Sequence, residues 1–186
     1  MNYFKITLGI FILLGSSVES NFAIAQIILF GLLSVPTGSI ASCYDGNNIN
    51  DCIKEAQQGN AYSQYLLGYS YHNGRGIEKN YTKAAMWYER AALEGVPEAQ
   101  NNLGLLYDSG QGVEQDYYEA VRWFRLAAEQ GFDRGQHNLA DAYYTGLGVR
   151  KNWGEALKWY RRAAAQGNEQ SINNARVLQK MMNKWP

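Results

Sequence analysis

The segment EALKWYRRAAAQG (residues 155–167) has two earlier copies in the chain, EAVRWFRLAAEQG (residues 119–131) and KAAMWYERAALEG (residues 83–95). The copies start 36 residues apart, and a glycine recurs at the same interval, at positions 59, 95, 131 and 167. A fixed period of this kind is typical of repeat proteins, in which each unit is one supersecondary element. The repeated positions therefore indicate the fold, and the positions that vary between copies are the candidates for function.

The first half of each unit predicts a helix that ends at a Gly-x-Gly motif. In the first unit Leu67 and Tyr71 lie four residues apart and share one side of the helix, and the small Gly68 beside them allows a neighbouring helix to approach. Gly74 and Gly76 then end the helix, because glycine adopts the left-handed conformation without a Cβ penalty. The later copies are Leu103, Gly104, Tyr107, Gly110 and Gly112, and Leu139, Ala140, Tyr143, Gly146 and Gly148.

The second half of each unit predicts a helix with an apolar stripe. Asn80, Asp116 and Asn152 stand at its start, where a side-chain oxygen accepts a hydrogen bond from an unpaired backbone N–H. Glu119 and Glu155 stand three residues after the caps of units two and three and predict capping boxes. The stripe has i, i+3, i+7 spacing. Its members are Ala84, Trp87, Ala91, Ala120, Trp123, Ala127, Ala156, Trp159 and Ala163.

The combined pattern of Leu-Gly-x-x-Tyr, Gly-x-Gly-Val, Ala-x-x-Trp-Tyr/Phe and Ala-Ala-x-x-Gly resembles the Sel1-like repeat family across residues 59–167. The related tetratricopeptide repeats have a period of about 34 residues and lack the Gly-x-Gly loop. The resemblance implies an all-α fold, a right-handed α-α superhelix (solenoid) of stacked antiparallel helix pairs. A single pair cannot bury its own apolar face, so its neighbours must cover it.

The chain divides into three full 36-residue repeats between two partial units. The Asn50–Gln58 segment matches only the end of a second helix and predicts an N-terminal cap that begins at Asn50 or Asp51. At the other end Ala175 and Gln179 replace the repeated leucine and tyrosine, which predicts a capping helix with a polar outer face. The predicted boundaries are an N-terminal segment at 1–42, a cap with the cysteine pair at 43–58, repeats at 59–94, 95–130 and 131–166, and the capping helix at 167–186.

Residues 1–42 differ in composition from the repeats. They contain one lysine, Lys5, and one acid, Glu19, with apolar runs at 6–15 and 22–35. Each run is shorter than the roughly 20 residues that a membrane-spanning helix needs. A positive start, an apolar region and small residues before a cleavage point describe a secretory signal peptide, and an uncleaved hydrophobic anchor is the alternative. We therefore expect an exported protein, periplasmic or secreted.

The two cysteines, Cys43 and Cys52, lie outside every repeat. In an exported chain an even number of cysteines favours a disulfide, which would stabilise the cap by about 2–3 kcal/mol. The alternative is that residues 40–43, IASC, which resemble a bacterial lipobox, make Cys43 a lipid-bearing membrane attachment point. The disulfide is the favoured prediction, and both remain open here.

Composition and motifs argue against several classes of function. The 17 basic and 17 acidic residues cancel, and no run of lysine or arginine exceeds two, so no nucleic-acid partner is expected. The two histidines, His72 and His137, fall at different repeat positions and belong to no cluster with metal-ligand spacing. The chain has neither a phosphate-binding loop nor a nucleophile elbow. We expect no cofactor, no metal and no catalytic residues.

The first helices carry a face whose residues differ between repeats. Positions spaced i, i+3, i+7 and i+10 share one side of a helix, and the resemblance implies that this side lines a concave groove. A tyrosine-rich face is typical of protein interfaces. The predicted partner-binding residues are Tyr62, Tyr65, Tyr69, His72, Asn101, Leu105, Asp108, His137, Asp141 and Tyr144. Glu98 and Arg134 occupy the same face.

These observations favour an exported, non-enzymatic scaffold that holds a peptide or a protein partner on the first helices. One alternative is a periplasmic immunity-type inhibitor of a toxic enzyme. Another is an enzyme acting on β-lactams or the cell wall, since some cysteine-rich Sel1-like proteins are associated with β-lactams. Those proteins carry a disulfide in each repeat, and the repeats of this chain contain no cysteine.

Overall fold

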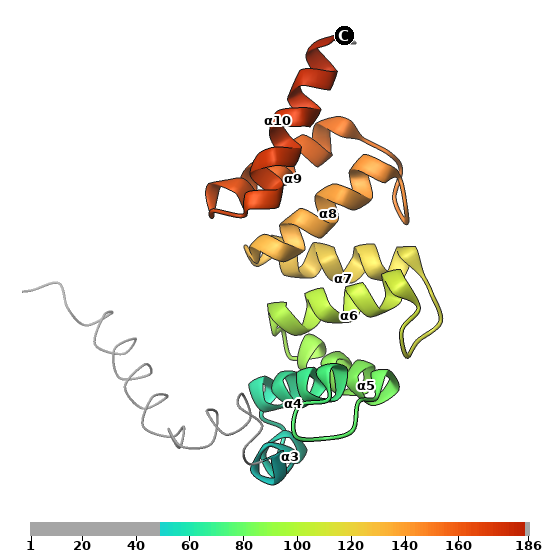
Figure 1. Cartoon of the computed structure of the whole chain (residues 1–186), viewed down its shortest axis with the longest axis vertical. Helices are drawn as coiled ribbons and strands as arrows, with labels where there is room; N and C mark the ends of the chain where they lie inside the picture. The colour runs from blue at the N-terminus through green and yellow to red at the C-terminus, as the bar shows by residue number, and fades with distance from the viewer. Residues whose placement is uncertain (1–48, 185–186) are drawn as a thin grey trace, which may run out of the picture. The chain divides into compact units, whose positions relative to one another are not determined.

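The computed structural model describes residues 49–184, and all regular secondary structure in this part of the chain is helical. The helices stack in chain order (Figure 1), and each packs on its neighbours in sequence. This confirms the predicted fold class of paired, stacked helices. The helices are α3 (Ile49–Gln57), α4 (Ala61–Asn73), α5 (Tyr81–Leu93), α6 (Pro97–Ser109), α7 (Tyr117–Glu129), α8 (Asp133–Thr145), α9 (Trp153–Ala165) and α10 (Glu169–Lys184).

The first glycine of each Gly-x-Gly motif ends a first helix, as predicted. Gly74 follows α4 with a φ of 74°, and its N–H donates to the carbonyl of Ser70. Gly110 and Gly146 end α6 and α8 in the same left-handed conformation. Each closing bond satisfies a carbonyl group that the helix end would otherwise leave unpaired.

The second glycine of the motif has a role that the sequence did not predict. A Cβ atom built on Gly112 would overlap the backbone of Tyr81, and one on Gly148 would overlap the backbone of Tyr117. Tyr81 and Tyr117 are the first residues of α5 and α7, the second helices of the preceding repeats. The second glycine is therefore a point of close contact between consecutive repeats.

The second helices begin at the predicted caps. Asn80 Oδ1 accepts from the backbone N–H of Lys83 at 2.9 Å. Asp116 accepts from Tyr118 and Glu119. Asn152 caps the third second helix in the same way.

The predicted capping boxes are wrong. The backbone N–H of Asp116 donates to the carbonyl of Tyr107 at 3.0 Å, so it is not available to Glu119. The equivalent N–H of Asn152 is taken by Tyr143. Glu119 and Glu155 instead form exposed ion pairs three residues further on, with Arg122 and Lys158.

The predicted apolar stripe forms the core. Its alanines and tryptophans are buried in all three second helices, and the repeated leucines of the first helices are buried opposite them. Trp87, Trp123 and Trp159 expose only 8%, 4% and 7% of their surface. Burial of this stripe between neighbouring helices supplies the main stabilisation of the stack.

A glutamine in each first helix connects the helix to the preceding repeat. Gln100 Nε2 donates to the carbonyl of Ala92 at 3.1 Å, and Gln64 and Gln136 make the equivalent bond. In repeats two and three a second glutamine, Gln130 or Gln166, donates in turn to the side-chain oxygen of the first. The buried amides of the first-helix glutamines therefore satisfy carbonyl groups near the ends of α3, α5 and α7.

The two ends of the stack are helical. Asn50 and Asp51 lie inside α3, which extends from Ile49, so neither of them starts the helix. At the other end α10 packs on α9 and buries Ser171 and Leu178. None of the helices between residues 49 and 184 combines the length and the apolar character needed to cross a membrane.

The predicted N-terminal segment 1–42 and Cys43 lie outside the described residues. Cys52 is fully buried in α3, with its Sγ 3.8 Å from the carbonyl oxygen of Ser63. The Cys43–Cys52 bridge stays a prediction.

Candidate functional site

The predicted tyrosines of the first repeat form one aromatic cluster along α4. The ring centroids of Tyr62 and Tyr65 are 5.5 Å apart, and those of Tyr65 and Tyr69 are 6.4 Å apart. Tyr88 of α5 lies behind them, 6.1 Å from Tyr65. Burial raises the pKa of Tyr65 to about 12, with a further contribution from Glu98. Tyr65 is therefore neutral at physiological pH.

Cationic side chains surround the end of α4. The Arg75 guanidinium lies 5.2 Å above the ring of Tyr69, and the Lys79 ammonium lies 4.6 Å above the ring of Tyr81. Tyr81 in turn meets His72 edge-on at 5.2 Å. Burial lowers the pKa of His72, and the charge of Lys79 lowers it further. His72 is thus mainly neutral near pH 7, and the positive charge of this region comes from Arg75 and Lys79.

Asn101 and His137 do not lie open on the predicted face. They expose only 2% and 9% of their surface. Asn101 Oδ1 accepts from Asn138 Nδ2 at 2.8 Å, and His137 Nδ1 lies 2.7 Å from Ser171 Oγ. This repeat position faces the next first helix, so Asn101 joins α6 to α8 and His137 joins α8 to α10.

His137 also has a carboxylate neighbour. Its Nε2 lies 3.3 Å from Asp141 Oδ2, which gives Ser171, His137 and Asp141 the connectivity of a serine–histidine–carboxylate triad. Ser171 exposes none of its surface and lines none of the pockets described below, so its hydroxyl is not accessible to a substrate. The arrangement joins two helices. Among residues 49–184 no cluster of three histidine, cysteine or acidic side chains is placed to hold a metal ion.

Three small pockets lie along the first helices. The Tyr88 pocket, of about 140 Å³, is lined by Tyr69, His72, Asn73, Tyr88, Asn102 and Leu105. The His137 pocket, of about 240 Å³, is lined by Asn101, Asn102, Leu105, Arg134, His137, Asn138, Asn168 and Gln170. The Tyr160 pocket, of about 190 Å³, is lined by Asp141, Tyr144, Tyr160, Asn174, Val177 and Leu178. Asn102 and Leu105 border both of the first two, so these pockets adjoin.

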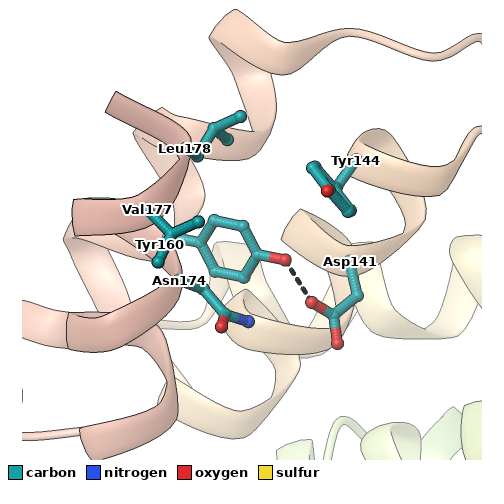
Figure 2. Close-up of a pocket in the computed structure, with 6 residues that line it drawn as sticks. All are labelled: Asp141, Tyr144, Tyr160, Asn174, Val177 and Leu178. Atoms are coloured by element: carbon teal, nitrogen blue, oxygen red, sulfur yellow. Dashed lines mark hydrogen bonds between the residues drawn. The ribbon is translucent and has the colours of Figure 1, made fainter. Parts of the chain in front are cut away.

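The Tyr160 pocket contains a partly buried hydrogen bond. The Tyr160 hydroxyl, from α9, donates to the carboxylate of Asp141, from α8 (Figure 2). Burial raises the pKa of Tyr160, and this carboxylate raises it further. Asn174 and Val177 close the pocket from α10.

Seven of the ten predicted residues line these pockets, and Tyr62, Tyr65 and Asp108 do not. Sequence reasoning missed the tyrosines of the second helices, Tyr88 and Tyr160, because they occupy the repeated Tyr/Phe position beside the tryptophans and it looked for function at positions that vary. It also missed the asparagines that line all three pockets. These are Asn102, Asn138 and Asn174, and their 36-residue interval is visible in the sequence.

The profile of the Sel1 repeat matches residues 61–96, 97–132 and 133–168. The three matches together cover more than half of the chain. The chain belongs to the Sel1 repeat family. The matched repeats have the predicted period of 36 residues, and each begins two residues later than the boundaries predicted above.

Solved structures show the same fold. The c5321 protein of Escherichia coli, described as a protective antigen of uropathogenic strains displaying an SLR fold, is 36% identical with a TM-score of 0.69 over 86% of this chain. A Sel1 repeat protein of Oxalobacter formigenes is 36% identical with a TM-score of 0.66 over 82% of this chain. The chain covers 35% and 59% of these two proteins.

A more distant structure shares the fold alone. Helicobacter pylori cysteine rich protein B is 21% identical with a TM-score of 0.55, and the match covers 68% of this chain and 91% of that protein. Among curated proteins, none matches the sequence.

Proposed function

We propose that this Sel1 repeat protein is a non-enzymatic scaffold that binds a peptide or a protein partner along α4, α6 and α8. The observation that carries the proposal is the row of three small pockets along these helices, lined mostly by residues that differ between repeats although the packing residues recur. Proteins of the Sel1 repeat family generally serve as scaffolds for protein–protein interaction, which supports it.

The sizes of the pockets favour side chains as ligands. They measure about 140, 190 and 240 Å³, below the roughly 300–1,000 Å³ of typical small-molecule sites. Leu105, which borders two of the pockets, and Tyr62, which belongs to the tyrosine cluster of α4, each expose 41% of their surface. Exposed tyrosine and leucine provide apolar contact around pockets that hold individual side chains, which is the composition of a peptide-binding face.

The proposal includes export, which rests on the composition of residues 1–42. A positively charged start followed by apolar residues supports a signal peptide or an anchor. The intact mass of the mature chain from its native host tests this. A cleaved chain lighter by two hydrogens indicates the Cys43–Cys52 bridge, and a mass increase matching a lipid indicates an anchored Cys43. An uncleaved chain recovered from the cytoplasm would contradict export.

A random 12-residue peptide library, selected on the full-length protein, tests the binding face. We expect the selected peptides to bind a Tyr62→Ala/Tyr69→Ala variant at least about tenfold more weakly, because the removed rings are the kind of anchor that dominates interfaces. Tyr118→Ala on α7 is the matched control, since Tyr118 is 77% exposed on a second helix. Equal binding by the double variant would place the site elsewhere. Turnover of a β-lactam or a peptidoglycan fragment by pure protein would contradict the non-enzymatic assignment.

A further inference from the structure

The Tyr88 and Tyr160 pockets are the same pocket built two repeats apart. Tyr88 and Tyr160 hold the same position in the second helices α5 and α9. The asparagine that lines each pocket, Asn102 or Asn174, is again at one repeat position. The two pockets differ at three lining positions, which carry Tyr69, His72 and Leu105 in the first pocket and Asp141, Tyr144 and Val177 in the second. The first of these positions decides whether the protein itself supplies a carboxylate.

In the Tyr160 pocket the protein supplies its own acceptor for the buried hydroxyl. The carboxylate of Asp141 points at Tyr160 from α8 and accepts its hydrogen bond (Figure 2). Asn174 approaches the same hydroxyl from α10 and acts on its pKa in the opposite direction to Asp141. The phenol oxygen thus has an amide on one side and a carboxylate on the other.

In the Tyr88 pocket no such acceptor is present. Tyr88 is fully buried, and among the described residues none accepts the proton of its hydroxyl; the neighbour that interacts with its oxygen is the side-chain amide of Asn102. Asn102 occupies the position that corresponds to Asn174. Burial raises the pKa of Tyr88, and the side chain of Asn102 beside the hydroxyl partly offsets this increase. Nδ1 of His72, which also lines this pocket, is a second buried polar atom without a hydrogen bond among residues 49–184. A buried donor without an acceptor is unfavourable, and an incoming acceptor would relieve this cost.

The charge beside the pocket favours an anion. Arg75 lies over Tyr69, which lines the pocket, and Lys79 lies over Tyr81, which contacts His72. Neither cation has an ion pair within 4.0 Å in the part of the chain that the structure describes. Two unneutralised cations at the end of α4 attract a negatively charged group to this pocket.

We propose that the Tyr88 pocket binds the side-chain carboxylate of an aspartate or glutamate in the partner, and that this carboxylate accepts the hydrogen bond of Tyr88 as Asp141 accepts that of Tyr160. The proposal rests on the proposed function, because it specifies what the binding face recognises. The pocket holds about 140 Å³, which suits a single acidic side chain.

The test uses the full-length protein and 12-residue peptides enriched on it from a random library. Each peptide is synthesised in pairs that differ by one Asp→Asn or Glu→Gln change, and affinities are measured by fluorescence anisotropy. For wild type we expect one such change to weaken binding by about tenfold or more, because hydrogen bonds to charged groups exceed those to neutral ones. Tyr88→Phe should bind the acid peptide and the amide peptide equally, with about the affinity that wild type has for the amide peptide.

The chain offers matched controls for these variants. Phenylalanine fits this position, since the second repeat carries Phe124 there, and thermal unfolding checks that Tyr88→Phe is folded. Tyr118→Phe makes the same chemical change on an exposed side chain of α7 and should keep the full acid–amide difference. Tyr69→Asp places a carboxylate at the position that Asp141 occupies in the Tyr160 pocket. This carboxylate competes with that of the peptide, so Tyr69→Asp should reduce the affinity for acidic peptides more than Tyr69→Asn does.

The outcomes separate this proposal from the one it rests on. Peptides that need Tyr62 and Tyr69 but bind equally well after every acid-to-amide change would overturn the carboxylate proposal and leave the binding face in place. An acid–amide difference that persists in Tyr88→Phe, or that disappears in Tyr118→Phe, would also overturn it. If no selected peptide depends on Tyr62 and Tyr69, the proposed function fails and the carboxylate proposal fails with it.

Discussion

At residue 94 the first repeat carries glutamate where the second and third carry Gln130 and Gln166. Those two glutamines donate hydrogen bonds to the side-chain oxygens of Gln100 and Gln136. An ionised carboxylate has no proton to donate. As a result the equivalent oxygen, Oε1 of Gln64, is buried without a hydrogen bond among the described residues.

Glu94→Gln should therefore stabilise the protein. The new amide can donate to Gln64 Oε1, and a restored buried hydrogen bond contributes about 1 kcal/mol. Urea unfolding of wild type and variant measures the difference. Glu89→Gln on the exposed side of α5 removes the same charge without reaching Gln64 and should leave the free energy of unfolding nearly unchanged. Equal changes in the free energy of unfolding for both substitutions would mean that the loss of charge, and not the bond to Gln64, causes the change.

His72 should make the protein less stable as the pH falls. Burial and Lys79 hold the pKa of His72 in the folded chain below its ordinary value of 6.5. The unfolded chain then binds more protons between these two pKa values, so the stability contributed by neutral His72 is present above about pH 6.5 and is lost below it. Urea unfolding at pH 7.5 and pH 5.5 should show a smaller pH-dependent loss for His72→Gln than for wild type. An identical loss would exclude His72 as its source.

The start of each second helix is fixed by two bonds that use different atoms. The side chain of Asp116 caps α7, and its backbone N–H binds Tyr107 of the preceding helix. The Gly-x-Gly loop lies between these two helices, and its second glycine touches the previous repeat. The loop is thus held at both ends and at its middle.

Gly112→Ala should be strongly destabilising. A methyl group there would overlap the backbone of Tyr81, and the φ of 74° is itself unfavourable for alanine. Strain and overpacking together should cost about 3 kcal/mol or more. Gly95→Ala is the control, because Gly95 has a φ of 89° but nothing within 4 Å of the added Cβ, and it should cost only about 1–2 kcal/mol. Similar unfolding midpoints for the two variants would show that the contact with Tyr81 is unimportant.

The elements were predictable because packing is what the repeats share. Leu67, Trp87 and Ala91 recur at one spacing and are buried as expected. The capping boxes were predicted wrongly because a glutamate three residues after the cap does not reveal how the backbone N–H of the cap residue is used. In Asp116 that N–H already donates to the carbonyl of Tyr107 in the previous helix. The prediction that Asn101 is exposed was wrong for a related reason. Periodicity tells on which side of its helix a residue lies, but not whether another helix covers that side.

Across residues 49–184 the contacts between repeats join neighbours in the stack. Gln136, for example, is bonded to α7 and to the end of α9. The inner helices therefore have partners on both sides. Of the end helices, α10 leaves Ile172 and Val177 exposed by 38% and 56%.

Hydrogen exchange should follow this arrangement. The amides of α10 should exchange faster than those of α6 and α7, because local opening costs less where fewer neighbours are buried. Mass spectrometry of the exchanging full-length protein resolves these segments. Equal protection of α10 and α7 would indicate that the stack opens only as one cooperative unit.

The contact of Gly112 with Tyr81 recurs one unit later between Gly148 and Tyr117. A whole repeat of 36 residues can therefore be inserted or deleted with the same contact re-formed between the repeats that become neighbours. If gene rearrangement removed residues 97–132, Gly148 would take the place of Gly112 against Tyr81, and Asn138 would take the place of Asn102 beside Tyr88. Asp141 would then replace Leu105 at the edge of the Tyr88 pocket. Shortening the protein by one whole unit would thus preserve the contacts between repeats while exchanging the side chains that line the pockets, so the surface of the first helices can change without a change in the scaffold.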